Sequence, residues 1–181
     1  MEKDKKWRVI ITRRNCEQRL VNNLMVRDVQ SFCPHCNFTS FHNDRVFIEK
    51  KPLFSSMLFL YIDDGQIENI SNIRNVTRFL YWTNSIAEVS QKDISHIYNF
   101  SNSFGNIQVE KCPVNPGAAY TDSLWTEDDN GSRIIVRLNS IGYQMISKKE
   151  DLYFKNQDPP VLGRNYFIHS FKINNSFKLA L

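Results

Sequence analysis

The longest almost unbroken apolar run of the chain covers residues 56–62, Ser-Met-Leu-Phe-Leu-Tyr-Ile. A strand with one wetted face would alternate apolar and polar residues, so this run predicts a central strand that is covered on both faces. A shorter apolar stretch at 46–48 predicts a strand before it. The charged break between them contains Lys51-Pro52, where proline favours extended geometry at Lys51 and removes one backbone donor.

The segment before this block predicts a strand followed by a helix. Trp7, Val9 and Ile11 alternate along residues 7–12, which predicts a strand with these side chains on one face. Apolar residues then recur at helical spacing up to residue 25. We expect Asn15 to cap this helix, with Gln18 placed three residues later as in a capping box.

Further elements complete a first domain over residues 5–104. The pattern predicts strands at 29–41 and 76–83, with a turn at residues 43–44 and a short helix over 66–74. Ser90 and Asp93 have the spacing of a capping box at the start of another helix. The predicted fold class is therefore α+β, an antiparallel sheet with packed helices. Residues 101–106 are a candidate linker.

The second part of the chain changes character. Short strands are predicted at 107–109, 118–125, 133–138 and 142–146, and the Asp-Asp-Asn-Gly sequence at 128–131 is typical of a hairpin turn. Close-spaced short strands of this kind predict a small β-barrel over 107–154. Residues 155–181 form a C-terminal extension without an assigned fold, in which 166–173 could be one more strand.

Charge is concentrated in the first third of the chain. Residues 1–55 carry 11 Lys and Arg against 6 Asp and Glu, a net charge of +5, and the rest carries 12 against 13. This excess fits a face that approaches nucleic acid or an acidic protein, and it also fits an ordinary solvated surface. The longest apolar run is far shorter than the roughly 20 residues that span a bilayer, and the charged N-terminus does not resemble a signal peptide. We expect a cytoplasmic protein with no membrane partner.

The cysteines and histidines offer one pattern with metal-like spacing. Cys33-Pro34-His35-Cys36 lies near His42, but the other two cysteines, Cys16 and Cys112, do not make a second pair. A structural zinc site needs four well-spaced ligands, so we expect reduced thiols buried on strands and no metal. No Gly-x-Ser-x-Gly pattern is present, and 6 glycines leave little material for a phosphate loop. The sequence therefore indicates neither an enzyme nor a cofactor.

The order of elements and several motifs together resemble the NusG family of transcription elongation factors. The resemblance rests on Trp7-Arg8-Val9-Ile10, the helix over 15–29, Lys51-Pro52-Leu53-Phe54-x-x-x-Leu58-Phe59-Leu60 and Arg74-Asn75-Val76-x-x-Phe79, with a weaker match at 134–143. It implies a NusG N-terminal-type domain at 5–104 and a degenerate KOW-type, SH3-like barrel at 107–154. The pattern is closer to the specialised RfaH, LoaP and UpxY types. One departure is Phe54-Ser55-Ser56-Met57, where the family often has Phe-Pro-Gly-Tyr or Phe-Pro-Asn-Tyr.

The resemblance also implies a function and partners. Family members bind RNA polymerase, bridge its cleft and suppress pausing and termination, in specialised types on particular operons. Carried over, the contact to the clamp coiled coil falls on Ile11, Phe54, Met57 and Phe59, and the contact to the gate loop on Gln66, Glu68 and Asn69. Arg13, Arg14, Arg74 and Arg78 become candidates for contact with the non-template DNA strand. We expect a monomer without enzymatic activity.

For several of these residues a purely structural role stays open. Phe59 fits a core position as well as an interface, because alternate strand positions point to opposite faces. Gln66 and its neighbours fit a solvated helix start equally well. From other functional classes, a nucleic-acid-binding module built on the barrel and a protein adaptor without polymerase binding are alternatives. The acidic residues in the barrel, Asp122, Glu127, Asp128 and Asp129, disfavour the nucleic-acid alternative.

Overall fold

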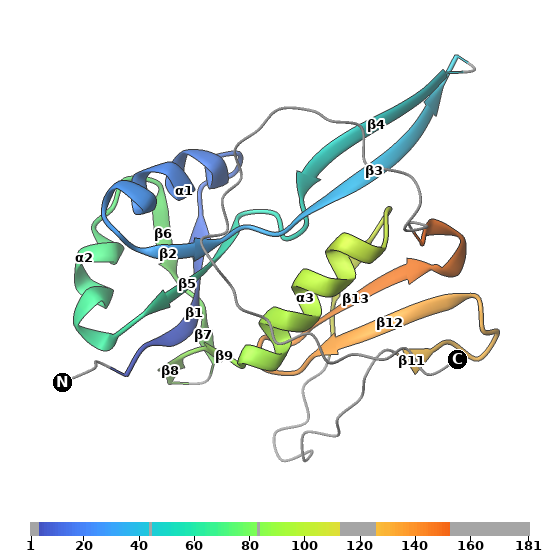
Figure 1. Cartoon of the computed structure of the whole chain (residues 1–181). Helices are drawn as coiled ribbons and strands as arrows, with labels where there is room; N and C mark the ends of the chain where they lie inside the picture. The colour runs from blue at the N-terminus through green and yellow to red at the C-terminus, as the bar shows by residue number, and fades with distance from the viewer. Residues whose placement is uncertain (1–3, 44, 83, 113–125, 153–181) are drawn as a thin grey trace.

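The computed structural model describes residues 4–43, 45–82, 84–112 and 126–152. The described part contains two larger antiparallel sheets, two two-stranded hairpins, one of which projects from the body, three α-helices and two short 3-10 helices (Figure 1). In its first half the elements are β1 (Lys6–Thr12), α1 (Glu17–Val26), β2 (Gln30–Phe32), β3 (His35–His42), β4 (Arg45–Pro52), β5 (Met57–Ile62), η1 (Asp64–Gln66), α2 (Ile67–Ser71) and β6 (Val76–Phe79). They are followed by β7 (Tyr81–Trp82), β8 (Ser85–Ile86), β9 (Glu88–Val89), α3 (Gln91–Ser103), β10 (Gln108–Lys111), β11 (Thr126–Glu127), β12 (Arg133–Leu138), β13 (Tyr143–Lys148) and η2 (Lys149–Asp151).

The first sheet has the strand order β2-β5-β1-β6, with β9 paired to β1 as well. Strand β5 lies between β2 and β1, and all of its residues except Tyr61 are buried. The prediction of a central strand covered on both faces is confirmed. The coarser prediction, an antiparallel sheet with packed helices, is confirmed too.

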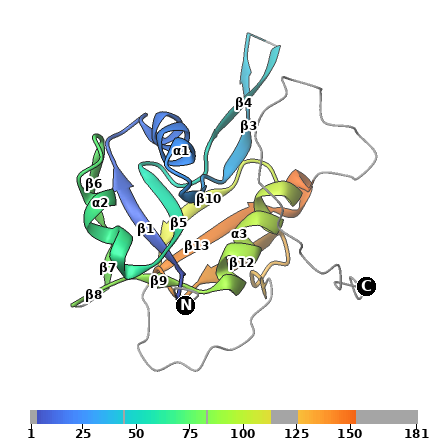
Figure 2. The same cartoon turned by 60° about the vertical axis from the view of Figure 1, so that its left-hand side comes forward.

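Each face of the first sheet carries its own core cluster. On one face, Ile10, Leu58 and Leu60 pack with Leu20 of α1 and Ile70 of α2. The opposite face carries side chains from the alternate strand positions and is covered by α3 and the second sheet. Figures 1 and 2 show α1 and α2 on one side of this sheet and α3 against the second sheet. Because side chains alternate along each strand, the two faces of the first sheet carry different core clusters.

Strands β3 and β4 form a two-stranded hairpin that projects from the body of the molecule (Figure 1). The single strand predicted over 29–41 is in fact two strands, because Cys33-Pro34 interrupts the pairing and β3 begins at His35. Strand β4 runs through the break predicted at Lys51-Pro52. Pro52 ends the strand, and the turn follows at Leu53–Ser56, where Ser56 takes a positive φ of 60°.

Two helix starts test the capping predictions in opposite ways. Ser90 caps α3 as predicted, since its hydroxyl accepts a hydrogen bond of 3.0 Å from the Asp93 backbone N–H. The predicted cap at Asn15 is wrong: Cys16 holds the cap position of α1 without a side-chain bond, and Asn15 has a φ of 59°. Asparagine tolerates this left-handed conformation, so Asn15 serves the turn before the helix instead. The helix predicted over 66–74 is shorter, η1 followed by α2.

The second sheet has the strand order β10-β13-β12-β11 and is antiparallel throughout. The hairpin turn predicted at 128–131 is confirmed, with Gly131 at a φ of 64°. Among the described residues these strands form an open sheet, so the predicted barrel is not confirmed. The strands predicted at 118–125 and 166–173 lie outside the described residues. No helix of the described part is long and apolar enough to cross a membrane.

Candidate functional site

One face of the first sheet brings together Ile11, Phe54, Met57 and Phe59, the four residues predicted to contact a partner; we call it the Phe54 face. Ile11 of β1 pairs with Met57 of β5, and two residues along Phe59 pairs with Val9, so these side chains share one face of the sheet. Phe54 comes from the turn before β5, and its ring meets that of Phe59 edge-on at 5.5 Å between centroids. The structure therefore brings these four residues together on one face.

The Phe54 face is covered rather than open. Phe54 is 3% exposed and Met57 7%, whereas a ready docking pocket would expose them. The cover consists of α3 and the second sheet, whose buried apolar side chains belong to the same core cluster. Tyr143 of β13 stands edge-on to Phe54, with ring centroids 6.2 Å apart. The sequence could not reveal this, because an apolar surface attracts an internal cover and an external partner by the same physics.

Polar contacts hold this cover in place. Asp93 of α3 accepts hydrogen bonds from both the backbone N–H and the hydroxyl of Ser140 in the turn between β12 and β13. The buried hydroxyl of Ser147 donates to the carbonyl oxygen of Gly105 at 2.8 Å. The second sheet is therefore bonded to both ends of α3, in addition to its apolar packing.

Asn106 joins three parts of the molecule. Its backbone N–H donates to the carbonyl oxygen of Asn37 at 3.0 Å, and its side-chain oxygen accepts from the Thr39 N–H at 2.7 Å, both on β3. Its side-chain nitrogen donates to the carboxylate of Asp151 at 2.6 Å. The base of the hairpin is thereby tied to the end of the second sheet.

The second predicted contact, Gln66, Glu68 and Asn69, lies elsewhere on the molecule. These residues belong to η1 and α2, which pack through Ile70 against the face of the sheet opposite to the Phe54 face. The Gln66 side chain is already engaged, since its oxygen accepts a hydrogen bond of 3.2 Å from the Asp63 N–H. Glu68 and Asn69 are exposed.

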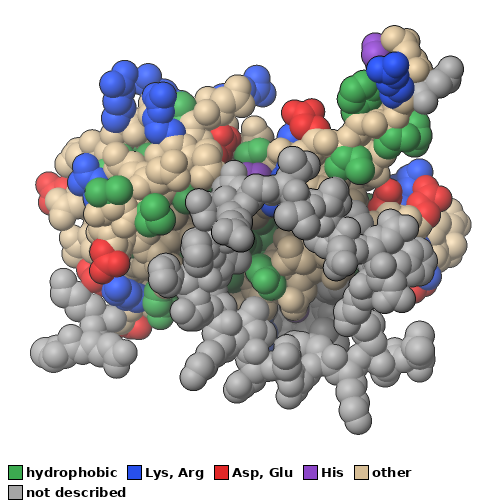
Figure 3. Space-filling model, turned by 45° about the horizontal axis from the view of Figure 1, so that its top comes forward, with side chains coloured by type: hydrophobic (Ala, Val, Ile, Leu, Met, Phe, Trp, Pro, Cys, Tyr) green, Lys and Arg blue, Asp and Glu red, His purple; other side chains and the backbone are tan. Residues whose placement is uncertain are grey.

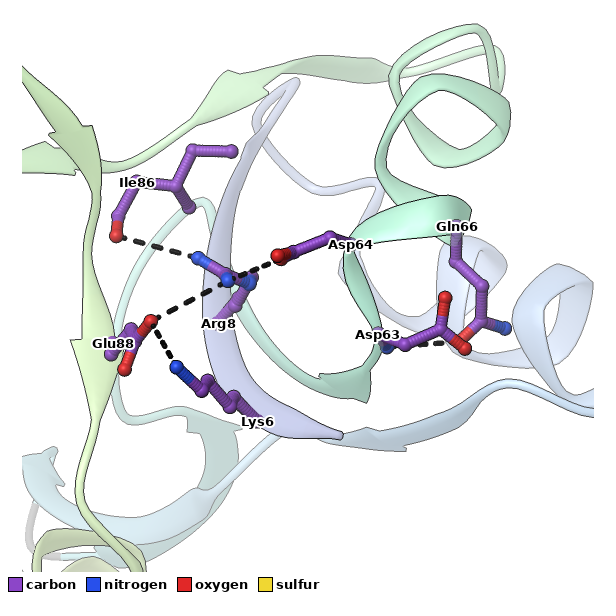
Figure 4. Close-up of polar contacts among 7 residues, drawn as sticks. All are labelled: Lys6, Arg8, Asp63, Asp64, Gln66, Ile86 and Glu88. Carbon is purple, nitrogen blue, oxygen red and sulfur yellow. Dashed lines mark hydrogen bonds and ion pairs between the residues drawn. The ribbon is translucent and has the colours of Figure 1, made fainter. Parts of the chain in front are cut away.

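A buried arginine positions this segment (Figure 4). Arg8 of β1 contacts the Asp64 carboxylate at 2.6 Å and that of Glu88 at 3.5 Å, and it donates to the Ile86 carbonyl oxygen at 3.5 Å. Lys6 also pairs with Glu88, and this hydrogen bond raises the pKa of the Lys6 ammonium. The network joins β1, the start of η1 and β9, and so fixes where Gln66 lies.

The predicted DNA-contacting arginines fall into two groups. Arg13 and Arg74 lie at neighbouring points, since the Arg13 N–H donates to the Asn75 carbonyl oxygen at 2.9 Å, and Arg14 follows in the same turn. Arg78 pairs with Ile11 and so belongs to the Phe54 face. All four are exposed, and none forms an ion pair with a described residue. They offer cations free for an anionic partner.

The first group gains a member that the sequence prediction missed. Arg19 of α1 and Arg74 line a small hollow of about 130 Å³, together with Leu20, Asn23 and Asn75. Figure 3 shows basic side chains gathering over this side of the molecule. In the sequence, the one indication that Arg19 could join this group was its position off the apolar stripe of the helix.

The candidate metal pattern does not form a site. In the described residues no group of three or more His, Cys, Asp and Glu side chains could hold a metal ion. Burial raises the pKa of the Cys33 thiol to about 12, and burial also lowers the pKa of His35, whose Nδ1 lies 2.8 Å from the Cys33 carbonyl oxygen. Such a thiol stays protonated at neutral pH.

A comparison with protein families decides the relationship. A family model described as "Transcription termination factor nusG" matches residues 5–98, just over half of the chain. The chain belongs to the NusG family. Among curated proteins nothing matches. Among solved structures, one described as "Domain interaction in Thermotoga maritima NusG" matches with 12% identity and a TM-score of 0.45, over 82% of this chain and 96% of that one.

The NusG match covers the elements from β1 into α3 and therefore contains every predicted contact residue. The second sheet lies beyond it. The residues that cover the Phe54 face from that sheet, such as Tyr143 and Met145, belong to a part of the chain for which the family model gives no guidance.

Proposed function

We propose that this NusG-family protein is a transcription elongation factor that binds RNA polymerase and suppresses pausing and termination on particular operons, as a specialised member of the family. The observation that carries the proposal is the family match over residues 5–98, which contains all the residues that the resemblance assigns to polymerase contacts. The protein makes and breaks no bonds. It acts by binding the elongating form of the polymerase better than the paused form, and so shifts the population toward elongation.

The geometry supports a bridging role. The Phe54 face receives the tip of the clamp coiled coil, where a few buried apolar anchors supply most of the binding energy. The gate loop meets Gln66, Glu68 and Asn69, which lie on elements that pack against the opposite face of the sheet. A rigid sheet between two such contacts holds two parts of the polymerase at a fixed separation. Arg13, Arg14 and Arg74, with Arg78 on the other face, contact phosphates of the non-template strand.

Binding through the Phe54 face requires that its cover moves away. Since Phe54 and Met57 are buried beneath α3 and the second sheet, only the uncovered fraction of the molecules is competent. The apparent affinity is then reduced by that fraction, and weakening the cover raises it. The cover therefore sets how readily the factor engages the polymerase.

A pull-down of purified RNA polymerase core with the full-length chain tests both parts of the proposal. Tyr143→Ala removes the aromatic contact to Phe54, a pair worth roughly 0.5–1.5 kcal/mol, so polymerase binding should strengthen by about two- to tenfold. Phe54→Asp should abolish binding. Met25→Asp makes a comparable change at a residue that is 65% exposed on α1, and it should leave binding unchanged.

Circular dichroism of each variant separates loss of the fold from loss of binding. If a folded Phe54→Asp variant still binds, the Phe54 face is not the docking site. If neither the wild type nor Tyr143→Ala binds, the chain shares the family's fold without its polymerase contact.

A further inference from the structure

The projecting β3–β4 hairpin carries apolar side chains that are exposed in the described part of the structure (Figure 3). Phe41 is 77% exposed, Val46 58%, Phe47 50% and Ile48 64%. Three of these residues follow one another on β4, where every residue except Pro52 is exposed. An apolar run on an exposed two-stranded ribbon indicates a surface that associates with another strand.

The backbone bonds of the hairpin show which groups point outward. The Asn37 carbonyl oxygen accepts from the Asn106 N–H, and the Thr39 N–H donates to the Asn106 side chain, so the odd-numbered residues of β3 point away from β4. These odd-numbered residues pair with even-numbered residues of β4. By the antiparallel pattern, Val46 and Ile48 therefore direct their own N–H and C=O groups toward the outer edge of β4.

This outer edge is partly protected against association. Among the described strands β4 pairs only with β3, so its outer edge has no described strand beside it. Lysine and proline commonly protect such edges. Lys50, Lys51 and Pro52 occupy the base of the hairpin, whereas Val46-Phe47-Ile48 lies nearer the tip. The unprotected part of the edge is thus its apolar part.

The sequence of β4 is self-complementary around Phe47. If two copies pair antiparallel with the two Phe47 residues opposite each other, Val46 faces the partner's Ile48 and Arg45 faces the partner's Glu49. Apolar residues then meet apolar residues, and each arginine meets a carboxylate. The hydrogen bonds match as well, because Val46 and Ile48 are the residues whose backbone groups point outward.

A shift of this register removes the match. With the two Ile48 residues opposite each other, Phe47 would face the partner's Glu49. Val46 would face the partner's Lys50. The pairing centred on Phe47 avoids both contacts between apolar and charged side chains.

We propose that two copies of this protein associate through the β4 edges of their hairpins, in a four-stranded antiparallel ribbon whose twofold axis passes between the two Phe47 residues. The interface is isologous, with the same surface on both copies. Because the hairpin projects from the body (Figure 1), antiparallel pairing places the two bodies at opposite ends of the ribbon. Pairing over residues 45–49 buries much less than the roughly 1,200–2,000 Å² of stable complexes, so the dimer is weak and reversible.

Self-complementarity favours a second copy over other occupants, since a different partner would not require β4 to match its own reverse. This dimer departs from the monomer that the family resemblance implies. The interface contains none of the residues assigned above to polymerase or DNA, so it is independent of the proposed function.

Sedimentation velocity of the full-length chain over a roughly hundredfold range of concentration, up to several hundred micromolar, tests the proposal. The wild type should change reversibly from monomer to dimer as the concentration rises. Glu49→Arg and Arg45→Glu each set like charges against each other at both ends of the paired segment, and each should weaken the dimer at least about fivefold. The two substitutions together restore opposite charges, and the dissociation constant should return to within about twofold of the wild type.

The charge reversal also has an internal control. Glu49 contacts Lys51 of its own hairpin at 2.8 Å, and Glu49→Arg removes this ion pair. Arg45→Glu leaves it in place. Weakening by both single variants and rescue by their combination therefore report the contact between copies, and failure of the rescue would overturn the proposed register.

A second pair of variants distinguishes strand pairing from unspecific apolar contact. Ile48→Asp places a charge within the paired segment and should weaken the dimer at least about tenfold. Phe41→Asp places the same charge one strand away, on β3, and should weaken it less than about threefold. Circular dichroism shows whether each variant is folded. Equal weakening by the two folded variants would overturn the proposal.

Amide hydrogen exchange measured by NMR locates the contact. In the dimer the N–H groups of Val46 and Ile48 donate to the partner, so their exchange should slow as the concentration rises, while that of Phe47, which points to β3, should not. A wild type that stays monomeric at the highest concentration would overturn the proposal. Slow exchange of Val46 and Ile48 at every concentration would overturn it too, and would assign the edge to a neighbour within the same chain.

Discussion

Arg8 shows how one side chain can be buried although its partners are not. The side chain is 7% exposed, whereas those of Asp64 and Glu88 are 81% and 50% exposed. The guanidinium has left water, but both carboxylates keep most of their hydration. Removing the arginine should therefore lower the free energy of unfolding less than removing both carboxylates, which leaves a buried charge behind.

The first residue-scale prediction uses this inequality. Arg8→Met keeps much of the buried volume and leaves two solvated carboxylates, so the free energy of unfolding should fall by about 1 kcal/mol or less. Asp64→Ala combined with Glu88→Ala leaves a buried cation that still donates to the Ile86 carbonyl oxygen but has lost both carboxylates, and should cost about 3 kcal/mol. Urea unfolding of both variants measures the difference. A larger loss in Arg8→Met would contradict the assignment of the buried charge as the costly partner.

At the residue scale, sequence reasoning succeeded where the chemistry is local. The cap at Ser90 was predictable because its bond to the Asp93 N–H spans three residues. The bond from Asp93 to Ser140 was not, since no local rule connects residues 47 positions apart. Asn15 misled because asparagine favours both helix caps and left-handed turns, and only the path of the chain decides between them.

At the scale of elements, the turn between β11 and β12 depends on one glycine. Gly131 has a φ of 64°, and an added Cβ would meet the Glu127 carboxylate at an ordinary contact distance of 3.5 Å. Strain, and not crowding, should therefore dominate: Gly131→Ala should lower the free energy of unfolding by about 1–2 kcal/mol. Gly131→Asn is the matched control, because asparagine visits this conformation more readily. Thermal or urea unfolding that ranks Asn below Ala would contradict this account.

The strands themselves were largely predictable. An apolar run such as 56–62 needs both of its faces buried, and the middle of a sheet provides this. Their ends were not. The predicted break at Lys51-Pro52 failed because β4 lies at an edge of its hairpin, where proline can end a strand without breaking a ladder. The strand predicted over 29–41 failed at Cys33-Pro34, where the chain leaves the first sheet for the hairpin.

On the scale of the whole molecule, one core cluster joins the two sheets. Trp7 and Phe59 of the first sheet, Phe100 of α3 and Met145 of the second sheet all belong to it. Met145→Ala should therefore destabilise both sheets together, by about 2–5 kcal/mol, because a fully buried side chain leaves a cavity. Met25→Ala, at a residue 65% exposed, should change stability by less than about 0.5 kcal/mol.

Hydrogen exchange in increasing urea distinguishes a shared core from two separate ones. Peptides from β5 and β13 should show the same loss of protection in Met145→Ala. If β13 alone loses protection while β5 keeps that of the wild type, the two sheets unfold as independent units.

The larger arrangement was the least predictable level. The four residues of the Phe54 face could be grouped from strand alternation and family resemblance. Their burial under Tyr143 depends on how the second sheet packs, and its apolar positions fit a closed barrel as well as an open sheet over α3. Patterns of period two specify which side of a strand is apolar, but they do not specify what lies against it.

The three bonds of Asn106 have a mechanical consequence. The amide side chain holds β3 through Thr39 and the second sheet through Asp151, so neither can shift alone without breaking one of these bonds. Uncovering the Phe54 face would therefore change the tilt of the hairpin in the same event. A fluorescent label at the tip of the β3–β4 hairpin would therefore report whether the Phe54 face is open, although the label would contact neither that face nor its cover.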